Sequence, residues 1–219
     1  MLLAIEKLLS RAEAAAIRAA ASTIEFGDGA TTAGRHARAV KANAQALPSP
    51  GLDAIRAKAT AALEASALFR AAARPRHVTP LILSRYRQGQ TYGTHVDDAM
   101  MGGLRTDISF TLFLSEPESY DGGELVLEDM FEPRAIRLGA GDLFLYPSTA
   151  LHRVEPVTRG ERLALVGWVQ SLIREPGRRE ILFDLDRSVE QIHAEQGPSE
   201  LFHTLAKTRS NLMRLWVSG

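Results

Sequence analysis

A histidine and an aspartate stand two positions apart, at His95 and Asp97. Side chains two apart on an extended segment share one face, so an imidazole nitrogen and a carboxylate oxygen can converge there on one ion. Asp98 is a competing carboxylate, but it would point to the other face of the same strand. Taken alone, the pair fits a surface hydrogen bond between His95 and Asp97 better than it fits an ion site. A third group is needed to favour a metal.

His152 is a candidate for that third group. It follows the apolar segment 143–146 and a proline, and it precedes a short strand-like segment, so a returning strand can bring it to the first pair. Two imidazoles and one carboxylate form the facial triad of non-haem iron(II) oxygenases, which leaves coordination positions open. The chain has no cysteine, so any metal here binds nitrogen and oxygen ligands. The other histidines have no partner at ligand spacing and are predicted to be surface or core residues: His36, His77, His193 and His203.

Arg162 lies ten residues after His152, at the start of the apolar segment 163–166. A guanidinium buried beside such a segment is unfavourable unless it meets an anion. Its planar fork suits two hydrogen bonds to a carboxylate, which predicts a binding site for an acidic ligand. The alternative is a structural salt bridge with Glu155 or Glu161, which would be the favoured interpretation without the metal site.

The segment 78–174 must position these residues, and it is predicted to consist of strands. Ile108, Phe110 and Leu112 alternate with Ser109 and Thr111, which is the strand period of two. Many short strands separated by glycine turns favour a sandwich or barrel. The other short apolar runs lie at 81–83, 125–127, 143–146 and 163–169.

Helices are expected on both sides of this core. The segment 1–77 is rich in alanine and begins with a capping box at Ser10 and Glu13; residues 27–34 and 48–51 interrupt it as loops. The segment 175–219 carries two apolar stripes at helical spacing. These stripes are predicted to pack on the chain's own core, with a homo-oligomer contact as the alternative. The expected class is therefore mainly β with flanking helices (α+β).

The composition excludes several classes of protein. Lysine plus arginine equals aspartate plus glutamate, at 26 each, so no overall charge attracts the chain to nucleic acid or to a membrane surface. No run of apolar residues approaches the length of a membrane span, and the N-terminus does not fit a signal peptide. We therefore expect a cytoplasmic protein without a nucleic-acid or membrane partner.

The ordered set of motifs resembles a known family. The chain is similar to the prolyl-4-hydroxylase-like branch of the iron(II)- and 2-oxoglutarate-dependent dioxygenases, and most of all to bacterial PKHD-type hydroxylases. The likeness extends to residues 29–34, Lys41 and Asn43 in the N-terminal segment and to the helical tail. The motifs are His95-x-Asp97, Gly122-Gly123-Glu124-Leu125, Gly141-Asp142-Leu143-Phe144-Leu145-Tyr146-Pro147-Ser148, His152-Arg153-Val154-Glu155-Pro156-Val157 and Gly160-x-Arg162.

The resemblance implies a double-stranded β-helix (jelly roll) and a hydroxylase that couples decarboxylation of 2-oxoglutarate to succinate with hydroxylation of a substrate. It implies Fe(2+) held by His95, Asp97 and His152, and 2-oxoglutarate held by Arg162, with Tyr86 as a further contact. Oxygen is the second co-substrate and ascorbate a candidate reductant. The expected division is a helical segment at 1–77, the dioxygenase core at 78–174 and a helical extension at 175–219.

Several points stay open at the level of sequence. Tyr86, Tyr92 and Trp168 lie near the predicted site, although core packing is the simpler role for each. Residues 98–106 are either a lid or a passive connection. The resemblance suggests a small-molecule substrate linked to iron uptake, or a peptidyl residue. The rivals are a cupin-like metalloenzyme that does not use 2-oxoglutarate and a sensor that binds metal and 2-oxoglutarate without turnover.

Overall fold

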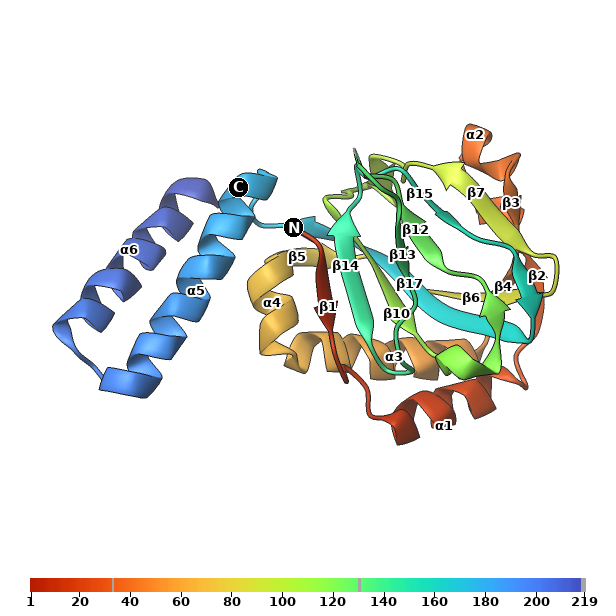
Figure 1. Ribbon diagram of the computed structural model, residues 1–219, viewed down its shortest axis with the longest axis horizontal. Helices are drawn as coiled ribbons and strands as arrows, with labels where there is room; N and C mark the ends of the chain where they lie inside the picture. Colours follow the sequence, from red (N-terminus) through yellow and green to blue (C-terminus); the bar gives the residue numbers. More distant parts are fainter. Residues whose placement is uncertain (33, 130, 218–219) are drawn as a thin grey trace.

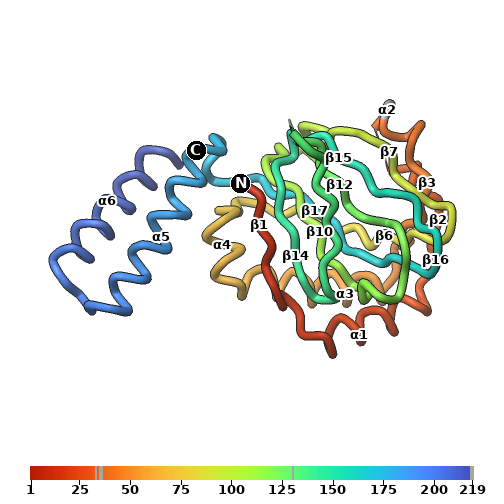
Figure 2. Tube along the Cα trace, viewed as in Figure 1, coloured from red at the N-terminus to blue at the C-terminus, as the bar shows by residue number. Residues whose placement is uncertain are grey.

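The computed structural model describes residues 1–32, 34–129 and 131–217, except for the side chains of Arg35 and His36. A body of β-sheets carries helices along one side, and a pair of helices extends from one end of this body (Figures 1 and 2). Every strand pair is antiparallel. The expectation of a mainly β protein with flanking helices is confirmed.

Two sheets make up the body. The main sheet has the strand order β1 (Leu3–Ile5), β14 (Leu143–Pro147), β10 (Ile108–Phe113), β17 (Glu161–Ser171), β6 (Ile82–Arg87), β4 (Ala44–Ala46) and β2 (Phe26–Asp28), with β5 (Pro75–Val78) also paired to β17. The smaller sheet has the order β13 (Arg134–Ile136), β12 (Leu125–Leu127), β15 (His152–Val154), β7 (Thr91–His95) and β3 (Lys41–Ala42). Two short ribbons complete the set: β11 (Asp121–Gly122) with β16 (Val157–Arg159), and β8 (Met100–Met101) with β9 (Leu104–Arg105).

Strand β10 shows how the two faces of the main sheet differ. All its residues are buried. Ile108, Phe110 and Leu112 belong to the large apolar cluster that the helices cover. On the other face, Phe113 packs with Leu125 of the smaller sheet. The polar positions of β10 therefore point between the two sheets rather than into solvent, and this places hydroxyl groups inside the body.

The helices begin and end where local capping predicts. Ser10 caps α1 in a complete capping box with Glu13, as expected. Ser49 caps α3, and Pro50 occupies its first turn, where no backbone N–H is needed. Apolar faces of α1, α3 and α4 then pack on the main sheet. The helices are α1 (Arg11–Ala21), α2 (Arg35–Arg38), α3 (Pro50–Ala65), α4 (Ala67–Ala73), α5 (Pro176–Gln196) and α6 (Glu200–Trp216), with 3-10 turns η1 (Gly29–Thr32) and η2 (Pro117–Ser119).

The N-terminal segment differs from the expected mostly helical layer because it also supplies strands to both sheets. β1 extends the edge of the main sheet beside β14, and β3 extends the smaller sheet beside β7. The expected loop at residues 27–34 includes the end of β2 and η1. These strands are two or three residues long, too short for a readable period of two.

The C-terminal helices α5 and α6 pack on each other, and α5 also contacts α4. Leu182, Phe183 and Val189 are the buried apolar residues of α5, whereas α6 has no buried residue. The buried Asp186 carboxylate joins the elements by pairing with Arg74 after α4 and with Arg209 of α6. A homo-oligomer contact through these helices stays a prediction. Among the described residues, no helix combines the length and apolarity needed to cross a membrane.

Candidate metal centre and its cavity

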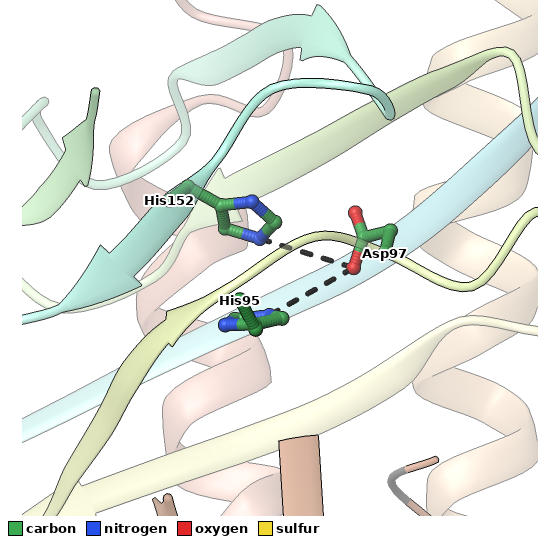
Figure 3. Close-up of side chains that lie close together, drawn as sticks. All are labelled: His95, Asp97 and His152. Atoms are coloured by element: carbon green, nitrogen blue, oxygen red, sulfur yellow. Dashed lines mark ion pairs between the residues drawn. The ribbon is translucent and has the colours of Figure 1, made fainter. Parts of the chain in front are cut away.

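The three predicted metal ligands come together between the sheets. His95 ends β7 and His152 begins β15, and the two residues are direct partners in the antiparallel pairing of these strands. The Nε2 atoms of His95 and His152 lie 3.9 and 3.8 Å from Asp97 Oδ1 (Figure 3). One ligand atom from each residue can be chosen so that all lie within 4.8 Å of one another. This donor set of two nitrogens and one oxygen could hold a divalent metal ion and leave positions open.

Both imidazoles are oriented by backbone carbonyl groups. His95 Nδ1 lies 2.8 Å from the carbonyl oxygen of Gly93, and His152 Nδ1 lies 3.0 Å from that of Ala150. A carbonyl only accepts, so each Nδ1 carries the proton and each Nε2 keeps a free lone pair for a metal. Burial, with a smaller effect from His152, lowers the pKa of His95 to about 4. His95 is therefore neutral near pH 7, as a metal ligand must be.

The Asp97 carboxylate is held by a pair of buried serines. Ser109 Oγ of β10 donates to Asp97 Oδ2 over 2.5 Å, and Ser148 Oγ lies 2.9 Å from Ser109 Oγ. Because the Ser109 hydroxyl has one hydrogen, the Ser148 hydroxyl is the donor in the second contact. Asp97 Oδ1 is then left to face the imidazoles. The neighbouring Asp98 is exposed and outside this group of ligand atoms, although it also lines the cavity. β7 ends at His95, so the strand period does not decide the direction of Asp98.

Arg162 is buried without a counter-ion among the residues that the structure describes. It lies on β17 opposite Tyr86 of β6, and it is only 2% exposed. Within the described chain its Nε has no hydrogen-bond partner and its guanidinium forms no salt bridge. Both carboxylates considered as partners are engaged elsewhere, since Glu155 pairs with Arg153 and Glu161 with Arg87. The alternative of a structural salt bridge is therefore wrong, and the guanidinium is available to an anionic ligand.

A single cavity connects this arginine to the candidate metal ligands. His95, Asp97, His152, Arg162 and Tyr86, the five predicted site residues, all line it. Burial raises the pKa of Tyr86 to about 12, so its phenol stays protonated and can donate a hydrogen bond.

Two further aromatic residues contribute to the site rather than to the core alone. Tyr92 stacks on the His95 ring with the ring centres 3.6 Å apart. Trp168 lines the cavity, and its buried Nε1 has no partner among the described residues. The simpler expectation of core packing was incomplete for both residues, because both line the cavity; on β17, Trp168 lies on the cavity face while Leu165 and Val169 belong to the apolar cluster.

One wall of the cavity consists of residues for which the sequence predicted no role in the site, although Lys41 and Asn43 take part in the family resemblance. Lys41, Asn43 and Gln45 line it from β3, β4 and the residue between them. Burial lowers the pKa of Lys41 to about 8, against the opposing effects of Asp97 and Asp28. The alternation of these polar residues with alanines in the segment 41–46 was the available signal.

Residues 98–106 form a short hairpin rather than an irregular loop. β8 and β9 pair across Gly102 and Gly103, whose φ angles of 57° and 80° suit a tight turn. Met101 lines the cavity, while Met100 is exposed. The role of a lid stays a hypothesis.

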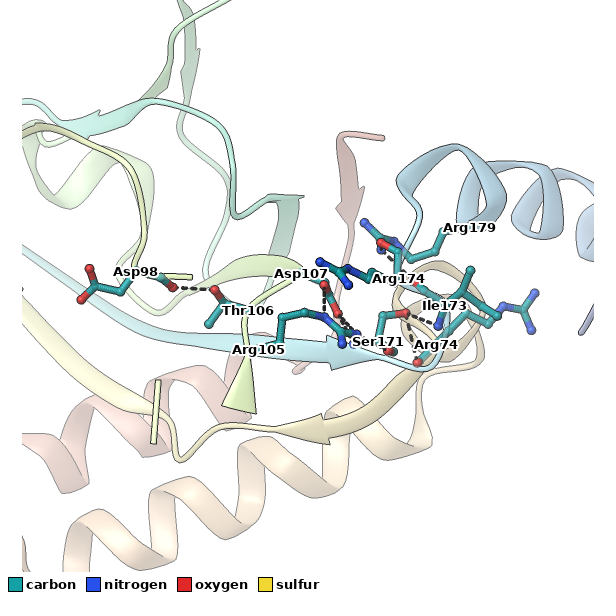
Figure 4. A network of polar contacts seen from close by, with 9 residues as sticks. All are labelled: Arg74, Asp98, Arg105, Thr106, Asp107, Ser171, Ile173, Arg174 and Arg179. Carbon is teal, nitrogen blue, oxygen red and sulfur yellow. Dashed lines mark hydrogen bonds and ion pairs between the residues drawn. The ribbon is translucent and has the colours of Figure 1, made fainter. Parts of the chain in front are cut away.

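A chain of polar contacts ties the base of this hairpin to the C-terminal extension (Figure 4). Arg105 binds both oxygens of Asp107, at 2.8 and 2.9 Å, and Asp107 Oδ2 accepts the backbone N–H of Ser171. Ser171 Oγ in turn contacts the Arg74 carbonyl and the N–H of Ile173, just before α5. The hairpin base is thus fixed to β17 and to the start of the extension.

Comparison with known proteins identifies the family. Residues 81–170 match the model of the family described as "2OG-Fe(II) oxygenase superfamily". Residues 177–218 match the model of the family described as "PKHD-type hydroxylase C-terminal domain". A PKHD-type hydroxylase of Maricaulis maris is 51% identical over 88% of each chain, and one of Synechococcus elongatus is 48% identical over 99% of each. The chain belongs to the PKHD-type hydroxylases.

Solved structures agree with the fold of this PKHD-type hydroxylase. A prolyl-4-hydroxylase of Pseudomonas putida is 22% identical, covers 78% of this chain and 92% of its own, and superposes with a TM-score of 0.51. A prolyl hydroxylase of Trichoplax adhaerens, solved with a peptide of a hypoxia inducible factor, is 16% identical with a TM-score of 0.56, over 78% of this chain and 83% of its own. The jelly-roll expectation is confirmed. The chain is an iron(II)- and 2-oxoglutarate-dependent dioxygenase, an oxidoreductase of the hydroxylase type.

Proposed function

We propose that this PKHD-type hydroxylase binds Fe(2+) through His95, Asp97 and His152, and binds 2-oxoglutarate through Arg162 and Tyr86. The observation that carries the proposal is the burial of the Arg162 guanidinium, without a counter-ion in the described part of the chain, in the cavity that the candidate ligands also line. A dicarboxylate with one end at the metal and the other at Arg162 satisfies both charges. The donor set fits Fe(2+), since neutral imidazoles and a carboxylate suit that ion and its open positions.

The bound metal would supply activation of oxygen, coupled to decarboxylation of the 2-oxo acid. The surrounding residues act on geometry and charge. Gly93 and Ala150 orient the two imidazoles, while Ser109 holds one oxygen of Asp97. Arg162 neutralises the distal carboxylate of the co-substrate and fixes its position. The Tyr86 phenol donates to the same ligand, because it stays protonated at neutral pH.

We infer that the molecule hydroxylated is a small one, with a link to iron uptake suggested by the family resemblance. A peptidyl substrate is the second candidate, supported by the peptide bound to the Trichoplax adhaerens prolyl hydroxylase. We also propose that ascorbate serves as a reductant for this enzyme.

The direct test is oxygen-dependent conversion of 2-oxoglutarate to succinate by the purified protein with added Fe(2+). His152→Ala should abolish turnover, since two of the proposed ligands cannot hold the ion well. Arg162→Met should raise the KM for 2-oxoglutarate by roughly 10–100-fold, because the variant loses a hydrogen-bonded pair of charges. Turnover should recover at high co-substrate concentration. Arg11→Met, an exposed arginine on α1, is the matched control and should behave as the wild type.

The contrary outcomes point to the rival functions. An iron-loaded protein that neither binds nor converts 2-oxoglutarate would overturn the proposal in favour of a cupin-like enzyme. Binding of 2-oxoglutarate through Arg162 without conversion, across small-molecule and peptide fractions, would indicate a sensor.

A further inference from the structure

A row of polar side chains forms one wall of the cavity. Lys41, Asn43 and Gln45 are two residues apart, so on extended backbone they share a face, and all of them line the cavity. β3 pairs with β7 of the smaller sheet, whereas β4 pairs with β6 of the main sheet. The segment therefore crosses from one sheet to the other, beside both the His95 strand and the Tyr86 strand.

Asn43 is buried in this wall, and no described residue forms a hydrogen bond with its amide. The residue is 3% exposed, and neither Nδ2 nor Oδ1 has a partner among the described residues. The amide lies beside the Tyr86 phenol and lowers the pKa of Tyr86 as a hydrogen-bond donor would, but the contact does not meet hydrogen-bond geometry. Gly29 leaves room for the amide, because a Cβ there would lie 1.9 Å from Asn43 Oδ1. An unsatisfied buried amide is costly, so this one indicates a missing polar ligand.

Lys41 places a cation next to this amide. Its Nζ donates to Thr32 Oγ1 over 3.2 Å, and Thr32 Oγ1 donates to Gln45 Oε1 over 2.7 Å. The ammonium lies 4.9 Å from the centre of the Tyr92 ring, which stacks on His95. Asp97 and Asp28 act on it electrostatically, yet it forms no salt bridge within the part of the chain that the structure describes. Two N–H groups of Lys41 thus remain available to a ligand.

The charges in the cavity leave this lysine unmatched once the proposed ligands are in place, and this step rests on the proposed function. Fe(2+) and Asp97 together carry one positive charge, and Arg162 adds another. The two carboxylates of 2-oxoglutarate offset both. Asp98 also lines the cavity, but it is exposed, and solvent screens it. Among the described residues that line the cavity, the Lys41 ammonium is then left without a neutralising negative charge.

We propose that Lys41 and Asn43 form a second carboxylate-binding subsite, which takes an acidic group of the molecule that is hydroxylated. The hydrogen bonds from Lys41 to Thr32 and from Thr32 to Gln45 hold the Lys41 ammonium in place. The Asn43 amide donates to the same carboxylate. The substrate class is accordingly a small molecule that bears a carboxylate within reach of the iron.

The test uses the full-length protein loaded with Mn(2+), which allows binding without turnover, and saturated with 2-oxoglutarate. The probes are N-acetylglycine and its uncharged amide analogue, N-acetylglycinamide. Paramagnetic relaxation of their proton signals by Mn(2+) reports binding near the metal. The acid should bind about tenfold more tightly than the amide, the magnitude of one charged hydrogen bond.

Substitutions assign that preference to residues. Lys41→Met and Asn43→Leu should each reduce the affinity for N-acetylglycine about tenfold and leave the affinity for 2-oxoglutarate unchanged. Lys41→Arg, which keeps the charge, should retain most of the binding, and thermal unfolding of each variant checks its fold. Lys207→Met, an exposed lysine on α6, is the control and should match the wild type.

The subsite is disproved if the wild type binds acid and amide equally or binds neither, or if both variants retain the acid preference. A tenfold loss of 2-oxoglutarate affinity in Lys41→Met would assign the subsite to the co-substrate instead and overturn its assignment to the second substrate. Failure of the proposed function is a different result, in which the Mn(2+)-loaded wild type does not bind 2-oxoglutarate at all.

Discussion

At the scale of single residues, the candidate metal centre depends on groups that do not face the metal themselves. The carbonyls of Gly93 and Ala150 select which imidazole nitrogen is free, and Ser109 selects which Asp97 oxygen is free. Such partners commonly change metal affinity by 10–100-fold when they are removed, because the ligand must then be ordered on binding.

Ser109→Ala should therefore weaken metal binding by roughly tenfold or more, while the metal-free protein keeps its fold. Competition with a chelator for bound Mn(2+) measures the affinity. Ser188→Ala, an exposed serine on α5, serves as the matched control. An unchanged affinity in Ser109→Ala would show that Asp97 is positioned by its backbone alone.

The low pKa of His95 predicts how the metal-free protein responds to acid. The folded-state pKa is about 4, below the ordinary value of 6.5, so between these values the unfolded chain binds more protons. Stability should consequently fall as the pH drops from 7 toward 4. In His95→Gln this contribution is absent, and the melting temperature should fall less between pH 7 and pH 5. An equal fall in both proteins would contradict the assignment.

At the scale of elements, the C-terminal extension is joined to the body by a buried ion cluster. Asp186 is 5% exposed and pairs with Arg74, which follows α4, and with Arg209 of α6. Since α6 has no buried residue, its position depends on α5 and on this cluster. Removal of one partner leaves buried charge uncompensated.

Asp186→Ala should lower the free energy of unfolding by about 3 kcal/mol, as measured by urea denaturation. Limited proteolysis should cut within α6 before the sheets unfold, because the extension loses its anchor first. Asp184→Ala, an exposed aspartate of the same helix, is the control and should change stability by less than about 0.5 kcal/mol. Similar losses in both variants would mean that helix packing alone holds the extension.

At the scale of the whole molecule, ligand binding and stability are coupled. The proposed ligands come from β7, the residues after it, β15, β6 and β17, so both sheets contribute to one site. Such a site exists only in the folded chain, and a bound ligand stabilises the fold according to its concentration and affinity.

Mn(2+) and 2-oxoglutarate together should raise the melting temperature by roughly 10–20 °C at about one hundred times their dissociation constants, with each ligand contributing about half of the shift. A chelator should reverse the shift. In Arg162→Met, the rise in melting temperature caused by the metal should remain, and most of the rise caused by 2-oxoglutarate should be lost. Differential scanning fluorimetry can measure the two contributions. A full shift in this variant would place the co-substrate elsewhere.

The sequence by itself determined the strand-rich core and the flanking helices, and it singled out five residues that line one cavity, whose roles stay a prediction. Local chemistry explains how far the sequence could go. Alternation at 108–112 reports a strand, the capping box at Ser10 reports a helix start, and the spacing of His95 and Asp97 reports a shared face. Each of these signals lies within a few neighbouring residues.

The tertiary structure decided what the polar residues of those strands do. Ser109 and Thr111 look like a solvent-facing set in sequence, yet they lie between the sheets and line or support the cavity. The partners of Arg162, and the absence of a salt bridge to it in the described chain, depend on how Glu155 and Glu161 pair across strands. Lys41 and Asn43 reach the cavity only because β3 and β4 join different sheets. Such contacts join residues far apart in the chain, and no local period encodes them.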